Sequence, residues 1–184
     1  KGLPARSWPL NGRGDDGLST GMIKYIALIG VLVLSACART DPPAPPPAAL
    51  ALYPGETPEI RALIVKYAQV HDIPEALIHR VIQRESDYRP RARNGPYWGM
   101  MQILPETAAQ MGHRGPPSTL LDAETTLIYA GRYLRGAWLV SDGDINEAVM
   151  WYARGYYYEA RDRCMLVETG LRTREVRRDC PSRT

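Results

Sequence analysis

The stretch "VIQRESDYRPRARNGPYWGMMQ", residues 81–102, begins as an amphipathic helix whose apolar face ends in a carboxylate. Glu85 lies four residues after Val81 and three after Ile82, so in a helix it shares their face, whereas the neighbouring Arg84 falls elsewhere. A carboxylate on an apolar face loses hydration, which favours its neutral form and raises its pKa. Glu85 is therefore a candidate general acid. The alternative is a helix-end residue that reaches past the apolar face into water.

Three motifs extend this signal along the chain. They are "ESDYRPRA" at residues 85–92, "GMMQILPETA" at 99–108 and "LLDAETTLIYAGRYLRG" at 120–136. In order and separation they resemble the signature of the soluble lytic transglycosylases, whose catalytic domain is related to goose-type lysozyme. The resemblance covers roughly 110 residues and is more specific than any single motif. It implies a mainly α, lysozyme-like helical domain, which we expect to span residues 56–165.

The resemblance also implies a substrate and a mechanism. Enzymes of this family cleave the β-1,4 bond between N-acetylmuramic acid and N-acetylglucosamine in peptidoglycan and form 1,6-anhydromuramic acid ends. They work with a single acid, whose position Glu85 matches, and we expect neither a cofactor nor a metal ion. Many glycosidases use two carboxylates, but Asp87 faces away if the helix continues. Glu106 and Asp122 stand at helix starts, where capping explains them.

The resemblance assigns further residues to the sugar cleft. Four of them are Ser86, which orients the site, Met101 and Gln102, which line the cleft, and Tyr152, which packs or hydrogen-bonds near the acid. Three aromatic residues are candidates for stacking on sugar faces, with ordinary packing as the alternative: Tyr97, Trp98 and Tyr156. One departure concerns "WYARG" at residues 151–155, where the family has Ala-Tyr-Asn-Ala-Gly. Ala153 replaces an Asn that often helps to bind sugar, which leaves the role of this loop open.

Two other functions stay open at this point. A lysozyme-type muramidase would admit water and leave a reducing end, and a non-catalytic peptidoglycan-binding lipoprotein would fit the loss of the Asn at Ala153. The presence of Glu85 and Gln102 favours an enzyme. A net charge of +3 gives no reason to expect a nucleic-acid partner. Peptidoglycan strands are the expected partner, and secretion or division machinery that spans the envelope is a further candidate.

The remaining helices follow from caps and apolar spacing. Asp72 followed by Glu75 reads as a capping box that opens the helix leading to Glu85. Other helix starts are predicted at Thr57-Pro58, at Pro105, at Asp122 and at Asp144. No strand with alternating hydrophobicity is expected, and no internal repeat is present.

The N-terminal part of the sequence predicts export. Residues 1–21 lack periodicity and read as an upstream extension outside the working protein, whereas residues 22–36 have the charged, apolar and small-residue regions of a signal peptide. A membrane-spanning helix is the alternative, but it needs about 20 apolar residues. The ending "LSAC" resembles the lipobox of bacterial lipoproteins, in which Cys37 is acylated, and a plain secretory signal is the alternative. Ala38 in place of Asp favours a periplasmic protein anchored to the outer membrane.

Residues 37–55 and the C-terminal tail flank the expected domain. The first segment is rich in proline, which favours an extended spacer, with a ligand for an SH3-like partner as the alternative. The tail, residues 166–184, is charged and is bracketed by Cys164 and Cys180, which more often pair than not in an exported protein. Metal binding is the alternative for these cysteines. The three histidines lack metal-ligand spacing: His71, His79 and His113.

Overall fold

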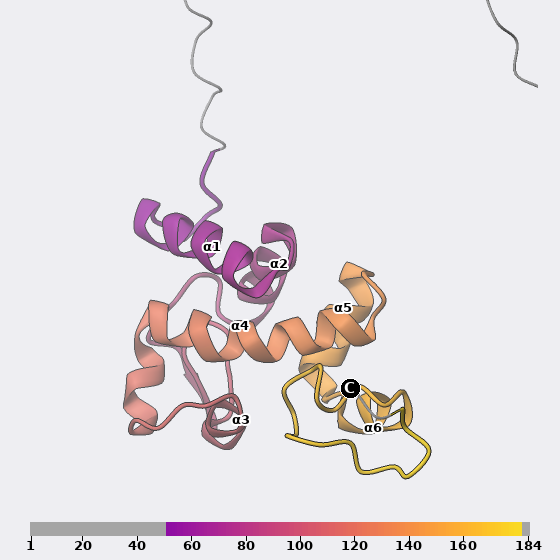
Figure 1. The fold of residues 1–184 in the computed structure, drawn as a ribbon. Helices are drawn as coiled ribbons and strands as arrows, with labels where there is room; N and C mark the ends of the chain where they lie inside the picture. Colours follow the sequence, from indigo (N-terminus) through magenta and orange to yellow (C-terminus); the bar gives the residue numbers. More distant parts are fainter. Residues whose placement is uncertain (1–50, 182–184) are drawn as a thin grey trace, which may run out of the picture. The chain divides into compact units, whose positions relative to one another are not determined.

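The computed structural model describes residues 51–181, and it confirms the mainly α-helical fold class (Figure 1). The predicted signal peptide, the lipobox and most of the tether lie outside the described residues. The helices are α1 (Pro58–His71), α2 (Glu75–Glu85), α3 (Pro105–Gln110), α4 (Ala123–Val140), α5 (Ile145–Arg154) and α6 (Tyr157–Asp162), with a 3-10 helix η1 (Pro117–Leu121). Within residues 51–181, no helix is both long and apolar enough to cross a membrane.

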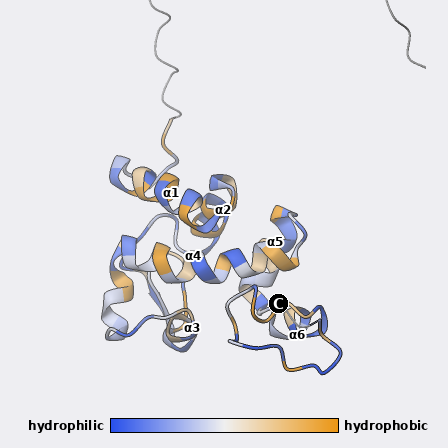
Figure 2. Ribbon diagram, in the orientation of Figure 1, coloured by the Kyte–Doolittle hydropathy of each residue, from blue (hydrophilic) through white to orange (hydrophobic). Residues whose placement is uncertain are grey.

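Helix α4 forms the centre of the domain (Figure 1), and its neighbours α1, α5, α3 and η1 all contact it. Both hydrophobic and hydrophilic residues occur along the helices, which gives each of them an apolar face to bury (Figure 2). On α4 that face is fully buried and consists of Leu127, Ala130, Leu134 and Ala137. Helix α2 also packs on α5, and this contact brings the end of α2 close to the end of α5. The site described below lies where these two helix ends meet.

Most helix starts are those that the sequence predicts. The Thr57 side chain accepts a hydrogen bond from the Ile60 backbone N–H, and Asp122 and Asp144 cap α4 and α5 in the same way. Pro105 opens α3 as expected. A local feature marks each of these starts, a side-chain acceptor for α1, α4 and α5 and a proline for α3, which is why the sequence alone reveals them.

The capping box predicted at Asp72 and Glu75 is wrong. Asp72 ends α1 instead of opening α2: it has a left-handed φ of 53°, and its N–H bonds to carbonyls of the last turn of α1. Aspartate tolerates this conformation better than most residues. Helix α2 begins after Pro74 and has no side-chain cap. The proline ring fixes the φ of Pro74 at −62°, and this residue is extended where the chain enters α2.

A small antiparallel hairpin interrupts the helices, although no strand was expected. Strands β1 (Arg93–Asn94) and β2 (Tyr97–Trp98) pair through a two-residue loop. Trp98 and Ile103 then exchange two backbone hydrogen bonds of 3.0 Å, which close residues 99–102 into a tight loop. Each strand has only two residues, too few for an alternating pattern to show in the sequence.

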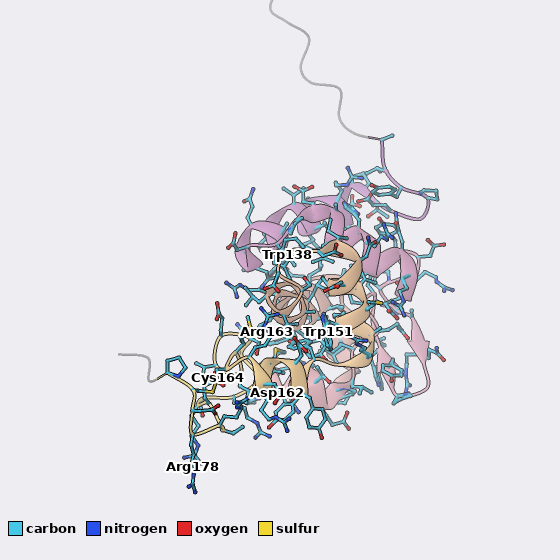
Figure 3. The ribbon with its side chains drawn as sticks, turned by 90° about the vertical axis from the view of Figure 1, so that its right-hand side faces the viewer. Trp138, Trp151, Asp162, Arg163, Cys164 and Arg178 are labelled. Carbon is cyan, nitrogen blue, oxygen red and sulfur yellow. A yellow bond between two sulfur atoms is a disulfide. The ribbon has the colours of Figure 1, made fainter. Side chains whose placement is uncertain are left out.

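The C-terminal segment is joined to the domain by a disulfide. Cys164 and Cys180 are bonded, with their sulfur atoms 1.99 Å apart (Figure 3 labels Cys164). The segment between them also contributes to the core, because Leu166 is fully buried and Thr169 is nearly so.

Candidate active site

Glu85 is the last residue of α2, and its side chain is 22% exposed. The residues one turn before it, Val81 and Ile82, are fully buried, so the carboxylate lies at the edge of the core as expected from the helical repeat. Burial raises the pKa of Glu85, and the nearby charge of Arg84 offsets part of this rise. Arg84 was expected to fall on another face, but its Nε lies 3.6 Å from Glu85 Oε1 because the helix ends there and the side chain is free to turn back.

The chain turns sharply directly after Glu85. Asp87 and Tyr88 have positive φ values of 56° and 61°, a conformation that an aromatic residue rarely adopts. Tyr88 is buried, and its hydroxyl lies 2.8 Å from His79 Nδ1 on α2, which holds the turn against the helix. Asp87 is exposed, and it lies outside the helix because α2 ends before it. The turn therefore leaves Glu85 at a free helix end.

Ser86 joins this helix end to the loop of residues 99–102. Its hydroxyl donates a 2.7 Å hydrogen bond to the Met100 carbonyl and accepts one from the Arg89 N–H at 3.2 Å. Ser86 is 3% exposed, so it is not available to a polymer in solution. The structure thus places Ser86 behind the groove, where its hydrogen bonds join α2 to the loop.

The loop of residues 99–102 has an unusual backbone. Gly99 has a φ of 77°, and a Cβ added there would lie 2.1 Å from the Leu120 carbonyl oxygen, so only glycine fits. Gln102 also has a positive φ, of 50°, and its amide donates to the carbonyls of Ala92 and Gly99 at 3.2 and 2.7 Å. Among the described residues, its buried Oε1 has no hydrogen-bond partner. The amide nitrogen of Gln102 thus anchors the side chain, while its oxygen is an acceptor without a partner among the described residues.

Met101 was expected to line the cleft, but its side chain does not. The side chain is fully buried in the core. Its carbonyl oxygen instead accepts a 2.8 Å hydrogen bond from the Tyr152 hydroxyl on α5. The turned backbone of the loop directs this side chain inward, and motif position alone does not reveal that direction.

Two adjoining cavities open in front of Glu85. The first, of about 340 Å³, is lined by Arg84, Glu85, Asn94, Tyr97, Gln102, Tyr152 and Ala153. The second, of about 210 Å³, is lined by Tyr97, Gln102, Ile103, Leu104, Thr107, Tyr133, Tyr152, Ala153, Arg154 and Gly155. Four residues line both cavities, namely Tyr97, Gln102, Tyr152 and Ala153. The two cavities therefore form one continuous groove, which we call the Glu85 groove.

Two larger hollows lie elsewhere, and their carboxylates lie at helix ends. The hollow of about 490 Å³ contains Asp72, which ends α1, and Glu75, which lies in the first turn of α2. The hollow of about 610 Å³ contains Asp122, whose carboxylate caps α4 by accepting from the Thr125 N–H at 2.8 Å. A carboxylate at a helix start stabilises the helix dipole in its charged form.

Glu85 is the only carboxylate among the described residues that line the Glu85 groove. Glu106 is exposed in the first turn of α3, and Asp122 caps α4. The groove therefore has the composition of a site that works with one acid, and not of a pair that flanks a bond from two sides.

Of the three aromatic residues expected to stack on sugars, Tyr97 lines the groove. Its side chain is 42% exposed and borders both cavities. Trp98 lines neither cavity, and the Arg93 guanidinium covers its ring at 3.6 Å. Tyr156 is 1% exposed, and its hydroxyl donates to the Tyr133 carbonyl, so it cannot stack on a sugar and the prediction for it is wrong. Gly136 makes this burial possible, because a Cβ there would lie 2.2 Å from the Tyr156 hydroxyl oxygen.

Tyr152 lines both cavities of the groove and is hydrogen-bonded to the loop of residues 99–102. It is 7% exposed, and burial, together with the charge of Glu85, raises its pKa well above the usual value. It therefore remains a neutral phenol that donates to the Met101 carbonyl. Its charge state does not change over the pH range in which Glu85 titrates.

Several groove residues were not predicted as site residues, and sequence signals for some of them exist. Asn94 lies in the hairpin, and the Asn-Gly pair that it forms with Gly95 is a common turn signal. Thr107 and Tyr133 belong to the second and third motifs. Arg154 is a departure from the family motif, so the motif gives it no role.

The histidines and cysteines do not form a metal centre. Within residues 51–181, no three His, Cys, Asp or Glu side chains lie close enough to hold a metal ion. Each histidine is engaged in a hydrogen bond: His71 with the Leu127 carbonyl, His79 with the Tyr88 hydroxyl and His113 with the Thr119 hydroxyl.

Comparison with known proteins identifies the family of the chain. No solved structure matches the chain. Residues 62–162, more than half of the chain, match the family described as the Transglycosylase SLT domain, and this range includes every residue that lines the Glu85 groove. The chain therefore belongs to the SLT family of transglycosylases, which act on peptidoglycan.

Proposed function

We propose that the protein is a lytic transglycosylase that cleaves the β-1,4 bond between N-acetylmuramic acid and N-acetylglucosamine and leaves a 1,6-anhydromuramic acid end. The observation that carries the proposal is the single acid of the Glu85 groove, whose pKa burial raises. A raised pKa keeps the carboxyl protonated closer to neutral pH, as a general acid requires.

The same residue serves both halves of the reaction. Protonated Glu85 gives its proton to the glycosidic oxygen, the bond from C1 to that oxygen breaks, and the N-acetylglucosamine part leaves as an alcohol. The C6 hydroxyl of the muramic acid then attacks C1, assisted by the N-acetyl group, and its proton passes to the Glu85 carboxylate. No water is consumed and the acid is regenerated. Intramolecular attack gains from a high effective molarity, so a second carboxylate to activate water is not needed.

The other groove residues support this chemistry in distinct ways. Ser86 and Tyr152 fix the loop through the carbonyls of Met100 and Met101. Tyr97 offers an exposed ring for a sugar face, and Gln102 borders both cavities. These residues build a groove with polar and aromatic walls, which suits a glycan strand.

Two alternatives make different predictions for the same assay. A muramidase would cleave the same bond with water, and a binding lipoprotein would not cleave at all, as the Ala153 departure would allow. Zymography on gels that contain cell walls, with wild-type protein beside Glu85→Gln, separates an enzyme from a binder. We expect a cleared band for the wild type and none for the variant; no clearing by either protein would exclude the proposed activity.

We further propose that the protein works in the periplasm, held by a lipid on Cys37, with outer-membrane anchoring as the default. The support is the lipobox-like "LSAC" at residues 34–37 and the proline-rich spacer that follows it. An anchor of this kind keeps a glycan-cleaving domain within reach of the cell wall.

A further inference from the structure

The end of α5 holds an arginine against a tryptophan at the groove. The Arg154 guanidinium carbon lies 3.8 Å from the centre of the Trp151 ring (Trp151 is labelled in Figure 3). Trp151 is partly buried and packs against the core, so the ring provides a fixed platform. Stacking on a fixed ring limits the positions open to the guanidinium. Both residues stand where the family motif has alanine, so the pair is a feature of this chain.

Arg154 lines the groove and has no acidic partner among residues 51–181. Arg154 borders the second cavity, and Ala153, which borders both cavities, brings only a methyl group to the groove. Within residues 51–181, no carboxylate lies within 4.0 Å of Arg154. Other arginines of the domain are paired closely: Arg61, Arg161 and Arg163 each have a carboxylate oxygen within 2.7 Å. Arg154 therefore presents an uncompensated positive charge to whatever occupies the groove.

We propose that Arg154, held by Trp151, binds a carboxylate of the substrate and makes the groove selective for acidic glycans over neutral ones. The inference rests on the proposed function and deepens it. N-acetylglucosamine carries no acid, whereas N-acetylmuramic acid carries a lactyl group whose carboxyl is either free or joined to a peptide with carboxylates of its own. A guanidinium matches a carboxylate with two parallel hydrogen bonds. The shared ligand chemistry is a carboxylate, from the lactyl group or from the peptide.

The test measures binding in the full chain with Glu85→Gln, so that ligands stay intact. Calorimetric titrations would use three soluble ligands: peptide-bearing glycan fragments, the same fragments stripped of peptides by an amidase, and chitotetraose as the neutral control. Each ligand is titrated into four proteins: the Glu85→Gln parent and the parent with Arg154→Met, Arg154→Lys or Arg172→Met added. Arg172 is the matched control, because it lies over the Tyr157 ring, is exposed, and does not line the groove. Thermal melting confirms that all four proteins are folded.

We expect Arg154→Met to weaken binding of an acidic glycan by roughly fivefold to tenfold at low salt, since an exposed charge-assisted contact is of this order. Chitotetraose binding should not change, Arg154→Lys should restore part of the loss, and Arg172→Met should have no effect. Added salt should reduce the difference, because it screens exposed charges. Loss confined to the peptide-bearing ligand assigns the carboxylate to the peptide, and loss confined to the stripped ligand assigns it to the lactyl group.

Three results would overturn the inference: an unchanged affinity for both acidic ligands, an equal loss for chitotetraose, or no binding of acidic glycans by the parent. These outcomes are separable from failure of the proposed function. If the wild type forms no anhydro ends but Arg154→Met still loses acidic ligands selectively, the selectivity stands and the transglycosylase chemistry falls. If anhydro ends form and Arg154→Met shows no selective loss, the transglycosylase chemistry stands and the selectivity falls.

Discussion

The Ser86 hydroxyl lies 2.7 Å from the Met100 carbonyl oxygen and donates a hydrogen bond to it, in a buried setting. This bond joins the residue that follows Glu85 to the loop that carries Gln102. The adjacent carbonyl, that of Met101, is held in turn by Tyr152 on α5. Two helices therefore fix two consecutive peptide units, and the acid and the loop that faces it keep a constant relation.

Replacing Ser86 with alanine should lower both stability and activity. The Met100 carbonyl would be left buried without its partner, which costs about 1–3 kcal/mol in the free energy of unfolding. The rate should fall as well, because the position of Glu85 relative to the loop is no longer fixed. Urea denaturation and turnover of purified cell walls measure the two effects.

The control for this variant is Thr169→Val, which removes another hydrogen bond from a side chain to a carbonyl, that of Met165 at 2.7 Å, while this carbonyl also accepts from the Thr169 backbone N–H at 2.9 Å. It lies in the C-terminal segment, beyond the groove. We expect a smaller loss of stability, because the Met165 carbonyl keeps its backbone partner, and an unchanged rate for the folded protein. Equal losses of activity in both variants would contradict the positioning role of Ser86.

The helix starts and the place of Glu85 could be predicted from the sequence because they depend on local chemistry. Thr57 and Asp122 bond to backbone N–H groups three residues ahead, and Glu85 follows the repeat of its own helix. Asp72 was misread because the same residue type serves as a helix end in a left-handed conformation. Which role it takes depends on Pro74, two residues later, and on the packing of both helices.

The side-chain directions in the site were harder to predict. Met101 and Gln102 are neighbours in one motif, yet the first is buried in the core and the second borders the groove. Positive φ values at Gly99 and Gln102 turn the loop, and no simple repeat describes such a backbone. Tyr156 is buried because Gly136, twenty positions earlier on α4, leaves space for its ring. Such a long-range fit is not visible in a motif.

Arg84→Gln should move the alkaline limb of the pH profile to higher pH. Burial raises the pKa of Glu85 and Arg84 lowers it in part, so loss of this positive charge should raise the pKa further. In the proposed mechanism, the active form of the free enzyme has Glu85 protonated. Activity is lost as pH rises through that pKa, and a higher pKa keeps the enzyme active to higher pH. The midpoint of kcat/KM against pH measures the shift.

Arg80→Gln is the matched control for this profile. Arg80 lies one turn earlier on α2, donates to the Asn146 side chain at 3.0 Å and does not line the groove. Its loss should leave the midpoint in place. A shift to lower pH in Arg84→Gln, or the same shift in both variants, would mean that the alkaline limb does not report Glu85.

Cys37→Ser should release the protein from the membrane fraction, because a serine cannot carry the lipid. Fractionation of cells with a carbonate wash, followed by immunoblotting, gives the distribution of both proteins. We expect the wild type in the membrane fraction and the variant in the soluble periplasmic fraction, provided that both are exported. A variant that stays membrane-bound after the wash would show that the anchor is not a lipid on Cys37.

The most direct test of the account is mass spectrometry of the products released from purified peptidoglycan by the wild type and by Glu85→Gln. The amide keeps the size of the side chain but can neither give nor take the proton, so the rate should fall by at least the roughly 10²–10⁴-fold typical of general acid–base catalysis. The account predicts wild-type fragments lighter by one water than those from a muramidase digest, and none from a folded Glu85→Gln variant. Wild-type fragments with reducing ends, or substantial release of anhydro fragments by the variant, would contradict it.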